Sequence, residues 1–433
     1  MLAVVLAYAA CREPEPAGGR ETGAVLAAPG LAGTVGASAS TGAAASARAF
    51  PAPATGATGA AGLAGGSGAS GQPAMPGAVA APRPAGALVM VAGGDVSFGR
   101  RLGQVLLRDP HHDPFAGLSG LLGGADLRFV NLESQLSDQH GETASPRERL
   151  VFTGPPEGAE ALARAGVDLV SLANNHMWDY GFRAFLETLG NLERVGIARV
   201  GAGRSPREFF APTILDRNGL RVAFIAVTDV WNDGRLQEHA ARMHVASADP
   251  DLLAHAVRAA RRRADVDAVV VSYHGGAEYT EAPLPRTRLI ARMAIDAGAD
   301  AFLGHHPHVI QGIALRRGRP IFYSLGNLVM RPNPREPDTV FGLVARLHLR
   351  RGEAPLVEVC PVRGEALGAV ALSRDPERGA TEAAVRGRLR EVQGGTEGAA
   401  EVEAFGPDGC AAVREVGGRG EEARGEARRQ GGR

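Results

Sequence analysis

Short apolar runs rich in Val, Ile and Leu alternate with longer segments of helical periodicity between residues 87 and 372. The apolar runs are bounded by Gly, Asp or Asn and predict strands that are covered on both faces; they span 88–93, 127–132, 167–173, 221–227, 266–273, 299–304 and 319–326. Apolar residues at three-to-four spacing predict helices over 155–166, 181–196 and 249–263. Two later strands, over 339–350 and 354–362, follow each other directly and predict an antiparallel portion. We therefore expect one α/β domain over 87–372.

An apolar segment and a low-complexity segment precede this domain. Residues 1–11 are largely apolar and end in Cys11, which predicts a bacterial lipoprotein-type signal. The segment is short and has no basic residue, so we expect its start to be truncated; the alternative is an apolar terminus with an incidental Cys. Residues 12–86 are mostly Ala, Gly, Pro, Ser and Thr, which bury too little apolar surface to fold and predict a disordered tether. Together these segments predict an extracytoplasmic domain that is anchored to the membrane or held in the cell envelope.

The last part of the chain changes composition again. Residues 373–433 are rich in Arg, Glu and Gly, which predicts a mostly disordered charged tail. Within it, 378–393 has the pattern of one amphipathic helix.

The basic residues are all arginine. The absence of lysine excludes Schiff-base chemistry and the lysine-dependent phosphate loop. The 47 basic residues are balanced by 47 acidic ones, so no global positive field attracts nucleic acid. We therefore expect no nucleic-acid partner.

Polar residues able to bind metal or carry a proton stand at the ends of successive predicted strands. They are Asp95, Asn131, Glu133, Asn174, Asn175, His176, His274, His306 and His308. Any one of them alone is more often a turn former, a cap or an ordinary buried side chain. Because the carboxyl ends of strands in α/β sheets meet at one crevice, their repetition predicts a shared site.

The donor types at these positions indicate the kind of metal. Imidazole, carboxylate and amide oxygen without thiolate suit Mn, Fe, Zn or Mg. The donors are numerous enough for two ions about 3.5–4 Å apart, an arrangement that activates water for displacement reactions. The 3 cysteines contain no CxxC pair, so a zinc finger is not indicated.

Six motifs at these residues resemble the CapA family of poly-γ-glutamate capsule synthesis proteins, which belongs to the calcineurin-like metallophosphatase superfamily. In the family's order they are GGDVSFGR (93–100), NLESQLSD (131–138), SLANNHMWDYG (171–181), YHGGAEY (273–279), GHHPHVIQG (304–312) and YSLGN (323–327). The resemblance implies a metallophosphatase-like four-layer αββα sandwich with mixed sheets. It also implies a centre of two divalent ions, with Mn, Fe or Zn as the candidates.

The resemblance also implies roles for individual residues. Carried over by position, the metal ligands would be Asp95 and His308 for the first ion, Glu133 as the bridging carboxylate, and Asn175, His274 and His306 for the second ion. His176 would protonate the leaving group. Ser97 departs from the superfamily pattern because a His usually occupies that position, so we expect a weaker first metal position.

Four further residues are candidates for catalysis or substrate binding, and three of them have an alternative role. Asp179 either orients His176 or caps the helix that starts near Gly181. Glu278 either orients His274 or binds a substrate amine. Asn327 either contacts substrate or stands in an ordinary turn. Arg100 could pair bidentately with a substrate carboxylate or phosphate.

Two functions remain open from the sequence. The first is a metal-dependent hydrolase at the cell envelope that cleaves a phosphoester or an amide, with His176 as the proton donor. The second is a non-catalytic accessory protein that binds poly-γ-glutamate during assembly or export. Both imply an anionic polymer or a phosphoester as ligand, and membrane proteins of capsule synthesis as partners.

Overall fold

The computed structural model describes residues 86–416 of the chain. The predicted signal segment at 1–11, the tether at 12–86 except its last residue, and the end of the predicted tail lie outside the described residues. Within 86–416, no helix is long and apolar enough to span a membrane.

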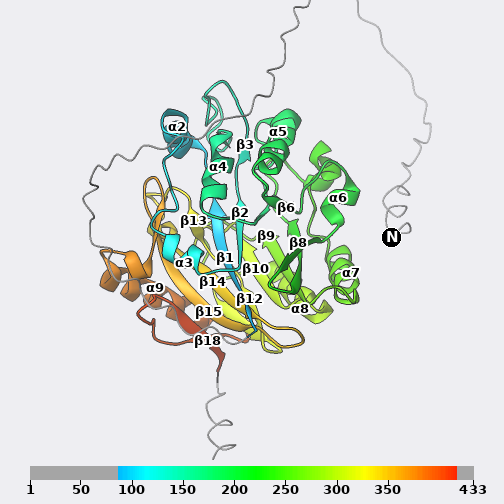
Figure 1. Ribbon diagram of the computed structural model, residues 1–433, viewed down its shortest axis with the longest axis vertical. Coiled ribbons are helices and arrows are strands. Elements are labelled where there is room, and N and C mark those ends of the chain that lie inside the picture. Colours follow the sequence, from blue (N-terminus) through cyan, green and yellow to red (C-terminus); the bar gives the residue numbers. More distant parts are fainter. Residues whose placement is uncertain (1–85, 417–433) are drawn as a thin grey trace, which may run out of the picture. The chain divides into compact units, whose positions relative to one another are not determined.

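Two large mixed sheets form the centre of the domain (Figure 1). The ten-stranded first sheet has the order β17, β18, β15, β14, β1, β2, β5, β6, with β13 beside β1 and β16 beside β15. Its strands are β1 (Leu88–Val96), β2 (Leu127–Leu132), β5 (Leu169–Ser171), β6 (Ala198–Val200), β13 (Asn327–Val329), β14 (Phe341–Leu349), β15 (Leu356–Gly364), β16 (Ala369–Ala371), β17 (Ala400–Val402) and β18 (Ala411–Glu415).

The six-stranded second sheet has the order β11, β12, β10, β9, β8, β7. Its strands are β7 (Thr213–Arg217), β8 (Leu220–Thr228), β9 (Ala268–His274), β10 (Ala301–His305), β11 (Ile313–Arg316) and β12 (Arg319–Phe322). A small parallel pair is formed by β3 (Gln135–Leu136) and β4 (Thr153–Gly154).

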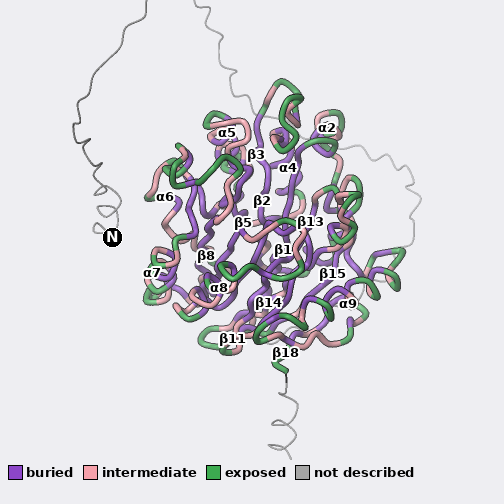
Figure 2. The backbone as a smooth tube through the Cα atoms, turned by 180° about the vertical axis from the view of Figure 1, so that it is seen from behind, coloured by how far each residue is buried: buried purple, intermediate pink, exposed green. Residues whose placement is uncertain are grey.

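Strand alternation explains why the two sheets pack face to face. Along β8, Val222 and Phe224 belong to the core between the sheets, and Phe224 stacks on Phe129 of β2 with ring centroids 5.8 Å apart. Ala223 and Ile225 point the other way and pack with the helices that cover the second sheet. Side chains alternate between the two faces along a strand. A fully apolar strand therefore packs against the facing sheet on one side and against helices on the other. Figure 2 shows the buried strands enclosed by more exposed helices and loops.

Helices cover the outer faces of both sheets and complete the four-layer arrangement. The α-helices are α2 (Arg100–Arg108), α3 (Ser119–Gly123), α4 (Glu157–Arg164), α5 (Gly181–Arg194), α6 (Pro206–Phe210), α7 (Pro250–Arg261), α8 (Pro285–Ala297) and α9 (Arg378–Gly394). Short 3-10 helices are η1 (Leu236–Glu238), η2 (Ala240–Met243), η3 (Pro337–Val340) and η4 (Leu372–Arg374). Helices α4 and α5 connect parallel strands of the first sheet, and α7 and α8 pack on the second.

The predicted strands and helices are confirmed, with small differences at their ends. Helix α7 begins where Asp249 caps it, accepting hydrogen bonds from the backbone N–H groups of Asp251 and Leu252. Helix α8 has no counterpart in the sequence analysis. Strand β1 runs past the predicted residue 93 because β13 pairs beside its end, with Asp95 opposite Asn327.

The predicted disordered tail is wrong over 373–416. The helix predicted at 378–393 is α9, and it buries Val385 and Leu389 against the domain. Strand β18 then pairs with β15, and a disulfide joins Cys360 in β15 to Cys410. The composition of this segment is polar overall, yet its few apolar residues pack against residues that are distant in sequence. The folded domain therefore extends beyond 372 to residue 416.

Candidate metal centre

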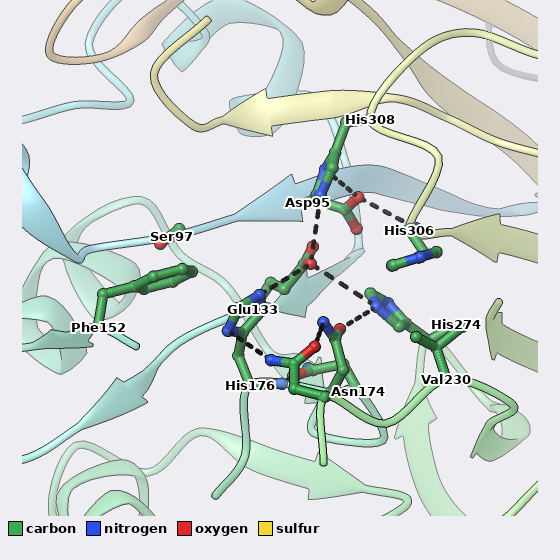
Figure 3. A network of polar contacts seen from close by, with 12 residues as sticks. Asp95, Ser97, Glu133, Phe152, Asn174, His176, Val230, His274, His306 and His308 are labelled. Atoms are coloured by element: carbon green, nitrogen blue, oxygen red, sulfur yellow. Dashed lines mark hydrogen bonds and ion pairs between the residues drawn. The ribbon is translucent and has the colours of Figure 1, made fainter. Parts of the chain in front are cut away.

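The carboxyl ends of five strands place the candidate residues around one point (Figure 3). Asp95 lies near the end of β1, and Glu133 directly follows β2. The loops after β5 and β10 contribute the others, together with the last residue of β9; these residues are Asn175, His176, His274, His306 and His308. All seven are buried. The parallel course of β1, β2 and β5, and of β8, β9 and β10, brings the ends together as the α/β pattern predicts.

Glu133 is the centre of this cluster. Its Oε1 lies 3.6 Å from Nε2 of His274, 3.6 Å from Nε2 of His308 and 4.0 Å from Nε2 of His176. The side chain is completely buried, and neither carboxylate oxygen has a hydrogen-bond partner among the described residues. Burial raises the pKa of Glu133 well above its usual value, and the nearby charge of Asp95 adds to this effect. A buried carboxylate without hydrogen bonds is costly unless a cation compensates it.

Asp95 is held from several sides. Its Oδ1 accepts a hydrogen bond from Nδ2 of Asn131 at 2.8 Å, and its Oδ2 accepts one from the backbone N–H of His306 at 3.2 Å. Nδ1 of His305 and Nδ1 of His308 each lie 3.3 Å from the carboxylate. Burial alone would raise the pKa of Asp95, but the two imidazoles outweigh it and hold the pKa well below the usual value.

The surroundings of His274 and His306 favour neutral imidazoles. Nε2 of His274 lies 2.7 Å from Oδ1 of Asn175, and its Nδ1 lies 3.2 Å from Nδ2 of Asn131. Burial and the neighbouring His306 lower the pKa of His274 well below its usual value. Burial and His308 lower the pKa of His306 to about 3. Neutral imidazole is the form that binds metal.

The backbone around two of the candidate ligands is strained. His306 and His308 have positive φ angles of 96° and 59°, in a region that favours glycine. Such conformations persist where the surrounding structure requires them, and they cluster at functional sites. Here they turn both imidazoles of the segment after β10 toward Glu133.

Two overlapping groups of donors fit divalent cations. Asp95, Glu133 and His274 form one group, and Glu133, His306 and His308 form the other, each with its ligand atoms within 4.8 Å of one another. Glu133 belongs to both groups, so its unpartnered carboxylate is placed to serve two positions. Oxygen and imidazole donors without thiolate suit borderline or hard divalent metals.

His176 and Asp179 form a hydrogen-bonded pair beside the donors. Nδ1 of His176 lies 2.8 Å from Oδ2 of Asp179, which also accepts a hydrogen bond from the backbone N–H of Phe152 at 3.0 Å. The rings of His176 and Phe152 lie 4.2 Å apart. The N-cap of α5 is Tyr180, which makes no side-chain cap. Asp179 therefore orients His176 and does not cap the helix.

The three predicted substrate-binding residues are placed differently from one another. Arg100 is exposed, with its guanidinium 4.3 Å above the ring of Phe152. Glu278 is also exposed and does not orient His274, which bonds Asn131 and Asn175 instead.

Asn327 is buried and begins β13, so the alternative of an ordinary turn is wrong for this residue. Its Oδ1 lies 3.1 Å from Nδ1 of His308, and its Nδ2 donates to the carbonyl oxygen of Thr339 at 3.1 Å. The side-chain amide is thus engaged within the protein and fixes His308.

His305 is a buried residue of the site that the sequence analysis missed. It ends β10, is completely buried, and neither ring nitrogen has a hydrogen-bond partner among the described residues. Ala301 and Leu303 of the same strand face the core between the sheets, so alternation alone could have placed His305 beside Asp95. At the position where an imidazole was expected, the hydroxyl of Ser97 accepts a hydrogen bond from the backbone N–H of Gly99.

Asn232 was also missed, because no strand or motif marks it. Its Oδ1 accepts a hydrogen bond from Nδ2 of Asn175 at 2.7 Å, and its Nδ2 lies 3.5 Å from Nδ1 of His176. A cavity of about 390 Å³ opens along the same loop and is lined by Thr228, Val230, Trp231, Arg235 and Arg286 among others. The backbone N–H of Asp229, also in its lining, donates to the carbonyl oxygen of His274, which links the cavity wall to the end of β9; the candidate donors themselves do not line the cavity.

Comparisons with known proteins agree with these motifs. The family model for "Bacterial capsule synthesis protein PGA_cap" matches residues 89–332. The chain is similar to the capsule biosynthesis protein CapA of Bacillus anthracis, with 30% identity over 281 residues that cover 64% of this chain and 67% of the relative. It is also similar to the PGA biosynthesis protein CapA of Bacillus subtilis, with 31% identity over 274 residues that cover 62% and 70% of the two chains. Among solved structures, a 5'-nucleotidase from Candida albicans aligns with a TM-score of 0.38 and 11% identity, over 71% of this chain and 57% of that one.

Proposed function

Because the chain belongs to the bacterial capsule synthesis protein family PGA_cap, we propose that it is a metal-dependent hydrolase acting in poly-γ-glutamate capsule synthesis at the cell envelope. One observation carries the proposal. The buried Glu133 carboxylate lacks hydrogen bonds, yet three imidazole nitrogens surround its Oε1 at 3.6–4.0 Å. One of those imidazoles, His176, is fixed by a carboxylate of its own. A cation-binding group and an oriented proton donor thus lie side by side.

By position in the family's motifs the donors would divide as follows, whereas the two donor groups in the structure pair Asp95 with His274 and His306 with His308. Asp95, Glu133 and His308 would hold the first of two divalent ions. Asn175, His274 and His306, again with Glu133, would hold the second. Mn, Fe and Zn are the candidates. When bound, such ions supply Lewis-acid activation of water and of the substrate.

The protein's own contribution to bond cleavage centres on His176. The hydrogen bond to Asp179 engages Nδ1, which leaves Nε2 directed toward Glu133. Because Nδ1 donates its proton to Asp179, His176 carries a second proton at Nε2 only as the imidazolium, and in that form it transfers the Nε2 proton to the leaving atom of a phosphoester or an amide. Asp179 stabilises the charged imidazolium, and Phe152 limits the motion of the ring. Both groups lie within a buried part of the site.

A location outside the cytoplasm is supported by the disulfide between Cys360 and Cys410. Structural disulfides are rare in reducing compartments and persist in secreted and envelope proteins. The segment around Cys11, which lies outside the described residues, has the pattern of a lipoprotein signal. We therefore place the domain at the cell envelope, tethered through that segment.

Turnover and metal content measured together test the proposal. Full-length protein loaded with Mn, Fe or Zn is assayed with a chromogenic phosphoester and with poly-γ-glutamate, and bound metal is counted by mass spectrometry. His176→Ala should lower kcat about 10²–10⁴-fold without changing metal content. His255→Ala, an exposed histidine on α7, serves as the matched control. Absence of turnover with every metal would contradict the hydrolase.

The alternative function is a non-catalytic accessory protein that binds poly-γ-glutamate. Ser97 favours it, because the superfamily's usual imidazole is missing from the first metal position. Under this alternative the metal centre binds polymer carboxylates and does not cleave the chain. Binding of poly-γ-glutamate by metal-loaded protein, without turnover of either substrate, would support the accessory role.

Stability gives a readout of the metal that does not depend on activity. A ligand that binds only the folded state raises the melting temperature. EDTA should therefore lower the Tm of the wild-type protein, and Mn or Zn should restore it. Glu133→Gln, which removes the charge shared by both donor groups, should largely abolish that response. An unchanged Tm on metal removal from the wild type would argue against a resident ion.

A further inference from the structure

Three chain segments meet beyond the end of β1. Strands β1 and β13 run parallel there, and the backbone N–H of Ser97 donates to the carbonyl oxygen of Val329 at 2.9 Å. Arg331 follows Val329 by two residues and so leaves the sheet beside the segment that leads to Arg100.

The third segment, residues 144–152, forms a small hairpin that carries Arg149. Ala144 and Phe152 pair across it as an antiparallel bridge. The backbone N–H of Arg100 donates to the carbonyl oxygen of Thr143 at 2.8 Å, and its Nη2 donates to the carbonyl oxygen of Arg149 at 3.3 Å. The fold therefore holds Arg100, Arg149 and Arg331 on one rim, which we call the arginine rim.

The guanidinium groups of the arginine rim are not held by ion pairs. Within residues 86–416, none of Arg100, Arg149 and Arg331 forms an ion pair with a carboxylate, although all three are exposed. By contrast, the half-buried Arg261 and Arg363 are each paired with an aspartate. The inner part of the Arg100 side chain is desolvated, which lowers its pKa; Tyr279 and Asp179 oppose this shift, and the positive charges of Arg149 and Arg331 add to it. Like charges gathered without a partner favour an anion between them.

The arginine rim borders the metal centre. The guanidinium of Arg100 lies 4.3 Å above the ring of Phe152, whose other neighbour is the imidazole of His176 at 4.2 Å. One aromatic ring thus separates the nearest guanidinium from the proposed proton donor. Asp179, whose carboxylate holds His176, is the acid on this side whose charge acts on Arg100. The exposed Glu278 is followed by Tyr279, whose ring lies 6.2 Å from that of His308.

We propose that the arginine rim is a polyanion-binding site that holds successive carboxylates of an acidic polymer next to the metal centre. Guanidinium groups bind carboxylates bidentately and stay charged at all physiological pH values. A chain with one carboxylate per repeat can satisfy several guanidiniums at once, which a small anion cannot do. This proposal rests on the proposed function for the identity of the polymer, which is poly-γ-glutamate. It predicts that the arginine rim binds this polymer even when no metal is present.

Binding to metal-free protein tests the rim separately from turnover. The EDTA-treated full-length protein is titrated with poly-γ-glutamate of defined length, followed by calorimetry at low and at high salt. Arg149→Gln/Arg331→Gln should weaken binding at least tenfold and reduce its salt dependence. Arg149→Lys/Arg331→Lys should recover part of the affinity, because the charge remains but the bidentate geometry does not.

Two exposed arginines at the other end of the second sheet supply the matched control. Arg258 and Arg262 lie at the end of α7 that leads into the start of β9, whereas the centre lies at the end of β9. They also form no ion pair within residues 86–416. Arg258→Gln/Arg262→Gln should leave the affinity within twofold of the wild type.

The outcomes separate this site from the hydrolase. An equal loss of affinity in the rim and control variants, or no loss in either, would contradict the proposal that the arginine rim binds the polymer. Tighter binding of polyphosphate than of poly-γ-glutamate would also overturn it, in favour of a phosphate polymer. The rim variant could lose polymer binding while the metal-loaded wild-type protein shows no turnover. That result would support the arginine rim as a binding site and reject the hydrolase. Each variant is first checked for unchanged Tm and metal uptake.

Discussion

Removal of the disulfide should destabilise the domain by a large and calculable amount. Cys360 and Cys410 are 50 residues apart, so the bond closes a long loop that contains α9 and β17. In the chain-entropy account, closing a loop of this length lowers the entropy of the unfolded state and so stabilises the folded state by about 4 kcal/mol. This value lies between those for loops of 15 and 100 residues. Both cysteines are buried in the apolar core, so alanine is the replacement that leaves no unpaired hydroxyl. We expect Cys360→Ala/Cys410→Ala to lose about 4 kcal/mol of unfolding free energy.

Urea unfolding followed by circular dichroism measures this difference. Wild-type protein unfolded in the presence of a reductant should lose the same free energy as the double variant. Cys11→Ala, which leaves the pair intact, is the control for substitution of a cysteine. A double variant within about 1 kcal/mol of the wild type, well below the loop-closure value, would refute the reasoning. Insensitivity of the wild type to the reductant would do so as well.

Three other substitutions test separate parts of the structure. Asp179→Asn should lower kcat about 10–100-fold at unchanged metal content, because the hydrogen bond that orients the proton donor is weakened. Gly94→Ala would place a Cβ 1.9 Å from a facing carbonyl oxygen and should cost about 3 kcal/mol in thermal unfolding, whereas Gly190→Ala in the open face of α5 should not destabilise. Asp375→Asn should lose about 3 kcal/mol at neutral pH because it removes the charge and one of the two oxygens that accept the 2.9 Å bonds from Arg363. Burial would raise the pKa of Asp375, but Arg363 holds it below 3.8; the stabilisation is therefore present above pH 3.8 and lost in stronger acid, where wild type and variant should converge.

The sequence predicted the layered core and most of the centre for the same physical reason. Short, fully apolar runs bounded by Gly, Asp or Asn favour strands covered on both sides, and the first polar residue after each run then lies at the edge of the sheet. Asp95, Glu133 and His274 were located in this way. The orientation of His176 by Asp179 was one of two open alternatives, since a three-residue spacing fits both a hydrogen bond and a cap.

The C-terminal region could not be predicted in the same way. Its composition is polar and glycine-rich, so local propensity favours disorder, while its order depends on pairing between β18 and β15. The partner of Cys360 could not be deduced either, because three cysteines allow three pairings and sequence spacing does not choose among them. Of the two alternatives for Glu278, the one in which it orients His274 is wrong, because closeness in sequence does not show which groups already satisfy an imidazole.

The position of β14 has a practical consequence for anyone who dissects this protein. The strand that carries Asp95 has β14 as its antiparallel neighbour over Leu88–Ala92, yet β14 lies beyond residue 332, where the family match ends. A fragment trimmed to that match would leave the backbone N–H and C=O groups on one side of a central strand unpaired. Such an exposed strand edge pairs with other molecules and causes aggregation. Recombinant work on the centre should therefore retain the chain at least through residue 416, and failure of a shorter piece to bind metal would say nothing about the native site.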